Sequence, residues 1–149
     1  MSQITGISSI TGLGSFVNQG IALDSTPNSV NWSNAEETYP NSAETTNQTF
    51  SGIDTTIKVY VKIIENPDGA IIEYSKNNGS WTDVGYNAPQ YNAVQISISN
   101  NDTLKFRATS PTSFGIYTLV DIMQNISGGD VVLDSIAFTV LGDGGGGPS

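Results

Sequence analysis

The chain has 149 residues and a mass of 15.7 kDa, enough for one domain with a sizeable core and too little for two. It contains no cysteine and no histidine, which excludes disulfides, thiol nucleophiles, imidazole bases and ordinary zinc sites. Five Lys and Arg against 14 Asp and Glu give a net charge of −9, so the sequence predicts no nucleic-acid partner.

Residues 1–23 contain no charged side chain and form an N-terminal arm. Large apolar residues recur in it at intervals of three, a period that fits neither an amphipathic helix nor a strand. These residues are Ile4, Ile7, Ile10, Leu13 and Phe16. One interpretation is a flexible leader with chance spacing; the other is an extended arm that becomes ordered on a neighbouring subunit, because uncovered apolar side chains are a liability on a soluble monomer.

Membrane insertion is not predicted for this chain. The arm lacks the basic stretch and the continuous apolar run of a signal peptide. Nowhere does an apolar run approach the roughly 18 residues of a membrane span. We therefore expect no anchor and no membrane partner.

Residues 24–49 are rich in Asn, Ser, Thr, Pro and acidic residues, with little periodicity. This composition predicts a polar loop segment that joins the sandwich. Val30 and Trp32 are exceptions that alternate with polar neighbours, and we expect Trp32 to be a core residue.

From residue 50 onward, short runs of alternating apolar and polar residues are separated by turn clusters such as NPDG at 66–69 and KNNG at 76–79. The predicted strands cover residues 56–65, 70–75, 80–86, 90–99, 103–109, 116–125 and 132–140. About seven strands at this spacing predict an all-β protein with a single antiparallel β-sandwich, Ig-like or jelly-roll-like, whose core is residues 50–140. Residues 141–149 form a Gly-rich tail that we expect to be flexible.

Carboxylates are the only general acid or base candidates, and none of them is spaced in a way that identifies a catalytic pair. We expect no catalytic residues, no enzyme activity and no cofactor. Two acidic groups could offer oxygen ligands to calcium: Asp102 with Asn100 and Asn101, and Asp130 with Asp134. Neither matches a calcium-loop motif, and turn geometry already explains Asp and Asn at such places, so no metal site is predicted.

Four aromatic residues cluster in the middle of the chain: Tyr74, Trp81, Tyr86 and Tyr91. They could form a stacking platform for a sugar ring. The interpretation that we favour places Trp81 in the core and the tyrosines at its edges.

Several short motifs follow one another in an order that is similar to a recurrent module of phage particles. They are VNWSN at 30–34, NQTFSGIDTTIKVYV at 47–61, GSW at 79–81, NNDTLKF at 100–106 and ISGGDVVLDSIAFTV at 126–140. In this order they resemble the Ig-like β-sandwich virion proteins of tailed bacteriophages, particularly marine and cyanobacterial phages. The arm at 1–23 and the acid-rich insert at 36–46 are not part of that module.

The resemblance implies a non-enzymatic structural protein of the virion, most simply a capsid decoration or cement protein or a tail-associated protein. Its partners would be other virion proteins and copies of itself, which it would contact through the apolar residues of the arm. The alternative function is a host-adsorption module that binds a host-surface glycan through the aromatic cluster.

Overall fold

We describe the protein from a computed structural model in which residues 27–85, 91–127 and 129–143 are described, with the backbone alone for residues 91–94. These residues form ten strands. In chain order the strands are β1 (Ala35–Thr38), β2 (Ala43–Glu44), β3 (Gln48–Thr49), β4 (Ile57–Glu65), β5 (Ile71–Lys76), β6 (Thr82–Asp83), β7 (Tyr91–Ile98), β8 (Thr103–Thr109), β9 (Ile116–Ile126) and β10 (Gly129–Leu141). Within the described ranges no helix is long and apolar enough to cross a membrane.

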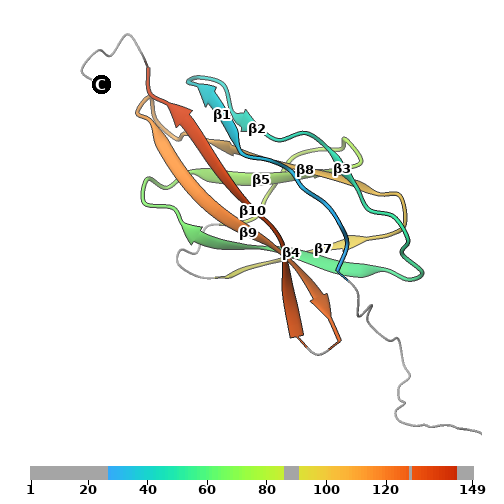
Figure 1. Ribbon diagram of the computed structural model, residues 1–149. Helices are drawn as coiled ribbons and strands as arrows, with labels where there is room; N and C mark the ends of the chain where they lie inside the picture. Colours follow the sequence, from blue (N-terminus) through green and yellow to red (C-terminus); the bar gives the residue numbers. More distant parts are fainter. Residues whose placement is uncertain (1–26, 86–90, 128, 144–149) are drawn as a thin grey trace, which may run out of the picture.

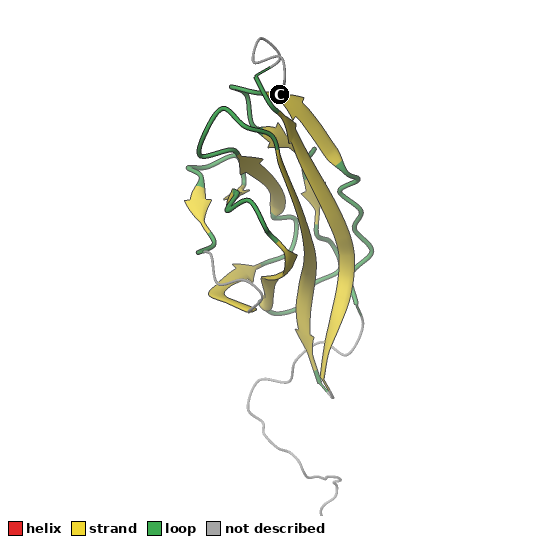
Figure 2. Cartoon of the chain, turned by 90° about the vertical axis from the view of Figure 1, so that its left-hand side faces the viewer, coloured by secondary structure: helices red, strands yellow, loops and turns green. Residues whose placement is uncertain are grey.

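The strands form two layers (Figures 1 and 2). Sheet A has the order β1-β10-β9-β4-β7, and sheet B has the order β2-β8-β5-β6 with β3 also on β8. Neighbouring strands are antiparallel except β1 and β10, which run parallel. The predicted all-β sandwich is confirmed, with ten strands in the described part of the chain where about seven were expected.

Alternation along the strands decides which side chains enter the core. The buried members of β4 and β8 are the apolar positions of their sequence patterns: Ile57, Val59, Val61 and Ile63 in β4, and Leu104, Phe106 and Ala108 in β8. Burial of each of the Ile, Val, Leu and Phe side chains among them contributes about 1.5–3 kcal/mol. One continuous core between the two sheets results.

Trp32 lies in this core although it belongs to no strand. Its side chain is 1% exposed, and its ring centroid lies 6.1 Å from that of Phe50 and 5.2 Å from that of Phe106. The indole Nε1 donates a hydrogen bond of 2.8 Å to the carbonyl oxygen of Leu104. A buried indole N–H needs such a partner, so both the apolar body and the polar tip of Trp32 are satisfied. The core role predicted for Trp32 is confirmed.

The segment 24–49 differs from the polar loop that we expected, because three short strands lie in it. β1 pairs with β10 in sheet A, the chain then passes through a cis Tyr39–Pro40 peptide, and β2 and β3 pair with β8 in sheet B. Backbone N–H and C=O groups form these ladders, whereas the side chains of β1 are mostly polar and exposed. The sequence of β1 therefore lacks the apolar–polar alternation from which a strand could be predicted. This segment is an integral part of both sheets.

The predicted strands and turns after residue 50 are mostly confirmed. β8 has the predicted bounds, and the turn between β5 and β6 places Asn77 and Asn78 at φ values of 54° and 58°, as a two-residue turn with two positive φ angles requires. β6 is much shorter than predicted for residues 80–86. It ends where the Asp83 carboxylate accepts the backbone N–H of Gly85 at 2.7 Å and Gly85 adopts a φ of 81°.

β9 and β10 form a long hairpin whose turn projects beyond the neighbouring strands (Figure 1). β10 begins at Gly129, earlier than the predicted residue 132, and its pairing with β9 shifts register between Val132 and Asp134. We call the end of the sandwich that carries this turn the tip end. Residues 144–149, most of the predicted tail, lie outside the described residues.

Candidate functional site

Residues 27–34 lie along the edge of β10, held by side chains rather than by a strand ladder. The backbone N–H of Asn28 donates to the Gln124 side chain at 3.1 Å, and that of Trp32 donates to the Asp134 carboxylate at 2.7 Å. Further along, the N–H of Ala137 donates to the Asn34 side chain at 2.9 Å. The segment therefore begins at the tip end of the sandwich and runs parallel to β10.

The candidate assembly residues of the arm lie outside the described part of the chain. They are Ile4, Ile7, Ile10, Leu13 and Phe16. The structure fixes only the point at which the arm joins the domain, because Asn28 is bonded beside the hairpin of β9 and β10.

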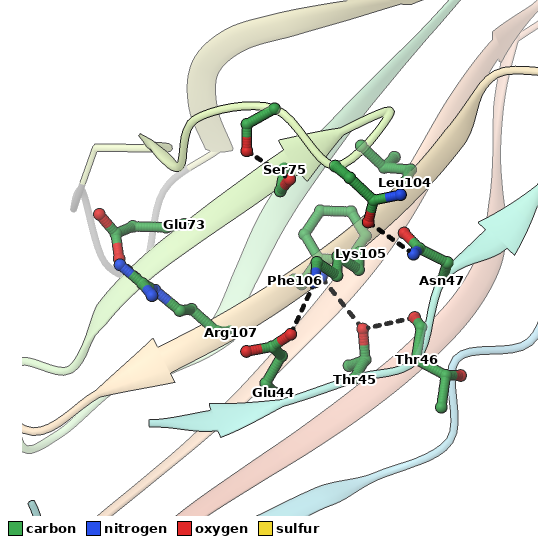
Figure 3. A network of polar contacts seen from close by, with 12 residues as sticks. Glu44, Thr45, Thr46, Asn47, Glu73, Ser75, Leu104, Lys105, Phe106 and Arg107 are labelled. Carbon is green, nitrogen blue, oxygen red and sulfur yellow. Dashed lines mark hydrogen bonds and ion pairs between the residues drawn. The ribbon is translucent and has the colours of Figure 1, made fainter. Parts of the chain in front are cut away.

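The outer face of sheet B carries two compact ion pairs (Figure 3). The Nζ of Lys105 lies 2.8 Å from a carboxylate oxygen of Glu44, and the Nε of Arg107 lies 2.7 Å from one of Glu73. Register places Glu44 and Glu73 on either side of Arg107, on the neighbouring strands β2 and β5. Both cations of β8 are therefore locally neutralised, which leaves this face poorly suited to binding an anion.

Trp81 lies on the same outer face. The Cζ of Arg107 is 4.2 Å from the centre of its ring, and the Nζ of Lys105 is 5.3 Å away, within the range of cation–π attraction. The side chain is only half-buried. Our favoured interpretation, which placed Trp81 in the core, is wrong, because Trp32 occupies the core and the turn after β5 returns Trp81 to the outside.

Tyr74 does not join Trp81 in a platform. It pairs in register with the buried Phe106 and packs against the core, so it lies on the inner face of sheet B while Trp81 lies on the outer face. Tyr91 belongs to β7 in the other sheet, where it pairs with Lys62, and its side chain is not described. Tyr86 lies outside the described residues. Of the predicted glycan contacts with a described side chain, only Trp81 faces outward from sheet B.

The acidic residues considered as possible calcium ligands accept hydrogen bonds from other groups of the chain. Asp102 accepts hydrogen bonds from the side chain of Asn77 at 2.9 Å and the backbone N–H of Ser99 at 2.8 Å, and these two bonds hold its pKa below the ordinary value. Asp134 accepts the N–H of Trp32, whereas Asp130 accepts a hydrogen bond from the Asn125 amide. No cluster of three or more metal-ligating side chains occurs among the residues that the structure describes.

The opposite end of the sandwich, here called the apolar end, exposes three large side chains. Phe114 is 74% exposed, Leu141 is 46% exposed and Tyr117 is 39% exposed. Tyr117 pairs with Thr139, two residues before Leu141, so the two side chains are diagonal neighbours on the outer face of sheet A. The backbone of Gly142 lies against that of residues 113–115, so the loop that carries Phe114 ends beside the end of β10. Tyr117 belongs to a predicted strand and Leu141 to the predicted tail, and neither of them nor Phe114 was among the predicted site residues.

Side-chain hydrogen bonds hold the loop that presents Phe114. The hydroxyl of the buried Ser110 shares its one hydrogen between the carbonyl oxygens of Thr112 at 2.7 Å and of Phe114 at 2.8 Å. The N–H of Asp143 donates to the carbonyl oxygen of Ser113 at 2.8 Å and ties the loop to the end of β10. Phe114 is thus fixed in an exposed position by an ordered loop.

No protein family and no curated protein matches the sequence. Solved structures that match over most of the chain include the N-terminal domain of PorA, with 13% sequence identity and a TM-score of 0.38, covering 80% of this chain and 96% of that one. They also include CfaE, the adhesive subunit of CFA/I fimbria of enterotoxigenic Escherichia coli, with 8% identity and a TM-score of 0.44, covering 81% of this chain and 50% of CfaE. Another is PapD-like domain 7 of human CEP192, with 9% identity and a TM-score of 0.39, covering 96% of each chain. The chain spans about half the length of CfaE. At such identities and scores the likeness concerns the fold alone, and no family membership follows from it.

Proposed function

We propose that the protein is a non-enzymatic structural subunit of a bacteriophage virion, a capsid decoration or cement protein or a tail-associated protein, which docks on its neighbours through residues 1–23. The observation that carries the proposal is the attachment of residues 27–34 along β10, through the bonds of Asn28, Trp32 and Asn34. These bonds attach the chain that follows the arm at the tip end of the sandwich. The proposed location in the virion rests on the sequence resemblance alone.

The mechanism is burial of apolar area. Each arm side chain covered by a neighbour contributes about 1.5–3 kcal/mol, or roughly 7.5–15 kcal/mol for five, which offsets part of the entropic cost of ordering an extended segment. The contact would repeat in every copy of a symmetric assembly. The absence of cysteine and histidine from the whole sequence supports a role without catalysis.

Changing the apolar arm residues to serine in the full chain tests the proposal. The variant carries Ile4→Ser, Ile7→Ser, Ile10→Ser, Leu13→Ser and Phe16→Ser. It should fold, as judged by circular dichroism, yet no longer be incorporated when particles assemble in its presence. A control with Thr5→Ala, Ser8→Ala and Thr11→Ala alters the polar positions of the same segment and should be incorporated normally. Unchanged incorporation of the serine variant would refute arm-mediated docking.

Trp81 supports a second candidate function, binding of a host-surface glycan, because its half-buried ring lies on the outside of sheet B. A glycan array tests this function. Binding by the native chain that is lost in a folded Trp81→Ala variant would favour it.

A further inference from the structure

We infer that Asn78 is a site of self-modification, at which the chain converts its own asparagine side chain to aspartate or isoaspartate, and that the Asn47 amide promotes the step. The site is the exposed turn that follows β5, and it is independent of the proposed function. Water is the one co-reactant, because the reacting groups belong to adjacent residues.

The sequence contains 14 asparagines, and only Asn78 is followed by a glycine, Gly79. In such a pair the backbone nitrogen of the glycine loses its proton and attacks the side-chain carbonyl carbon of the asparagine. The new C–N bond closes a five-membered succinimide ring, and the former amide nitrogen leaves with a proton as ammonia. One water molecule then opens the ring, which yields aspartate or isoaspartate. Glycine favours the attack because no Cβ stands beside its nitrogen.

Water, which the last step consumes, reaches this turn freely. Both Asn78 and Gly79 are exposed. Asn66 shows the opposite situation, since it is 3% exposed and its side chain bonds to both backbone groups of Ala70. The residue after it is Pro67, which has no N–H that could attack. Position and neighbour therefore both favour reaction at Asn78.

The Asn47 side chain supplies a hydrogen bond at the reacting group. Its Nδ2 donates to Oδ1 of Asn78 at 2.9 Å. When the Gly79 nitrogen adds to the side-chain carbon of Asn78, this oxygen gains negative charge, and a donor already aimed at it lowers the barrier. Asn47 directly precedes β3, which pairs with β8, so the sheet holds the donor beside the turn.

The turn itself restrains the reaction. The Gly79 N–H donates to the carbonyl oxygen of Lys76 at 2.9 Å, and both Asn77 and Asn78 have positive φ values. The nitrogen can attack only after this bond opens and its proton is lost. Local opening of a turn costs much less than global unfolding, so the modification accumulates in the folded protein, and faster as the pH rises.

The product changes both the charge and the backbone of the turn. Each conversion adds one negative charge to the net charge of −9. In isoaspartate the backbone runs through the former side-chain carbon, which lengthens the chain between residues 78 and 79. A two-residue turn with two positive φ angles does not accommodate this extra atom. The segment that carries Trp81 onto the outer face of sheet B then loses its fixed start.

Incubation of the full chain in mildly alkaline water labelled with ¹⁸O tests the inference. Peptide mapping by mass spectrometry then locates each asparagine that has become aspartate or isoaspartate with ¹⁸O from water. We expect Asn78 to convert faster than any other asparagine, with both products present. Gly79→Ala should slow conversion at Asn78 by about tenfold, because a Cβ hinders the attacking nitrogen. Faster conversion at another asparagine, or none at Asn78, would overturn the assigned site.

Asn47→Leu tests the role of the donor. It removes the hydrogen bond to Asn78 and should slow conversion in the folded chain by about threefold to tenfold, less than loss of a buried oxyanion donor because the site is exposed. A purely structural role would act in the opposite direction, since loss of this bond loosens the turn and speeds the attack.

Thr46→Leu changes the adjacent exposed side chain and is the matched control, with a conversion rate equal to that of the native chain. In concentrated urea the contact between Asn47 and Asn78 is lost, so Asn47→Leu and the native chain should react at equal rates. Equal or faster conversion of folded Asn47→Leu, or a difference that persists in urea, would overturn the role assigned to Asn47.

Discussion

The two tryptophans of this chain occupy opposite environments, and the same conservative substitution at each should give very different results. Trp32→Phe removes the hydrogen bond of 2.8 Å to the Leu104 carbonyl inside the core. Loss of that hydrogen bond costs about 0.5–1.5 kcal/mol, and the cavity left by the smaller ring adds about 1 kcal/mol. We therefore expect the free energy of unfolding to fall by about 1.5–2.5 kcal/mol, out of a total of about 5–15 kcal/mol for a domain.

Trp81→Phe is the matched control. Its ring lies on the outer face of sheet B near Arg107, where a cation–π contact contributes about 0.5–1 kcal/mol and a phenyl ring keeps part of it. The loss of stability should thus stay below about 1 kcal/mol. Urea unfolding followed by far-UV circular dichroism measures both values without relying on tryptophan emission.

Each variant keeps one tryptophan, which gives an independent readout. The emission of Trp81→Phe reports the 1% exposed Trp32 and should be blue-shifted relative to that of Trp32→Phe. Equal destabilisation by the two substitutions, or a loss below about 1 kcal/mol for Trp32→Phe, would refute the assignment of Trp32 as the core residue.

Two further predictions concern charged groups. Hydrogen bonds from Asn77 and Ser99 lower the pKa of Asp102 in the folded protein, so its contribution to stability is complete above the ordinary value of 3.8 and disappears as the pH falls through the lowered pKa. In acid titrations, the difference in unfolding free energy between the native chain and Asp102→Asn should therefore shrink below pH 3.8. A constant difference would contradict this prediction. For the partly exposed pair of Arg107 and Glu73, a double-mutant cycle combines Arg107→Gln with Glu73→Gln. The coupling free energy should be less than about 1 kcal/mol and should decrease in 1 M salt. A larger or salt-independent coupling would show that the pair is more strongly desolvated than its geometry indicates.

The fold after residue 50 could be predicted because local and global preferences agree there. In β4 and β8 every second residue is apolar and faces one core, and the turns carry Asn and Gly where positive φ angles are needed. Before residue 50 this agreement is missing. β1 is an edge strand whose side chains are mostly exposed, so its pairing with β10 depends on backbone groups that no sequence pattern displays.

The candidate sites were harder to predict. Whether a side chain is buried depends on which face of the sheet it occupies after the preceding turn, and the local sequence does not show this. Trp32 and Trp81 are equally large and both follow polar residues, yet only the first lies between the sheets. Phe114 follows a Ser-Pro-Thr-Ser stretch that reads as a simple loop, and only the hydrogen bonds of Ser110 reveal that this loop is ordered. For Tyr74, by contrast, alternation with Ile72 already indicates the inner face of sheet B, where it packs against the core.

The parallel pairing of β1 with β10 has a mechanical consequence. The described chain begins at the tip end beside Gln124 and finishes at the apolar end, where Asp143 is bonded to Ser113. Tension applied between these two points pulls β1 and β10 in opposite directions along their common axis. The ladder from Ala35–Phe138 to Thr38–Leu141 is then loaded in shear, with all its bonds strained together instead of one after another. A ladder loaded in shear resists a pulling force far better than a ladder whose hydrogen bonds are opened one at a time.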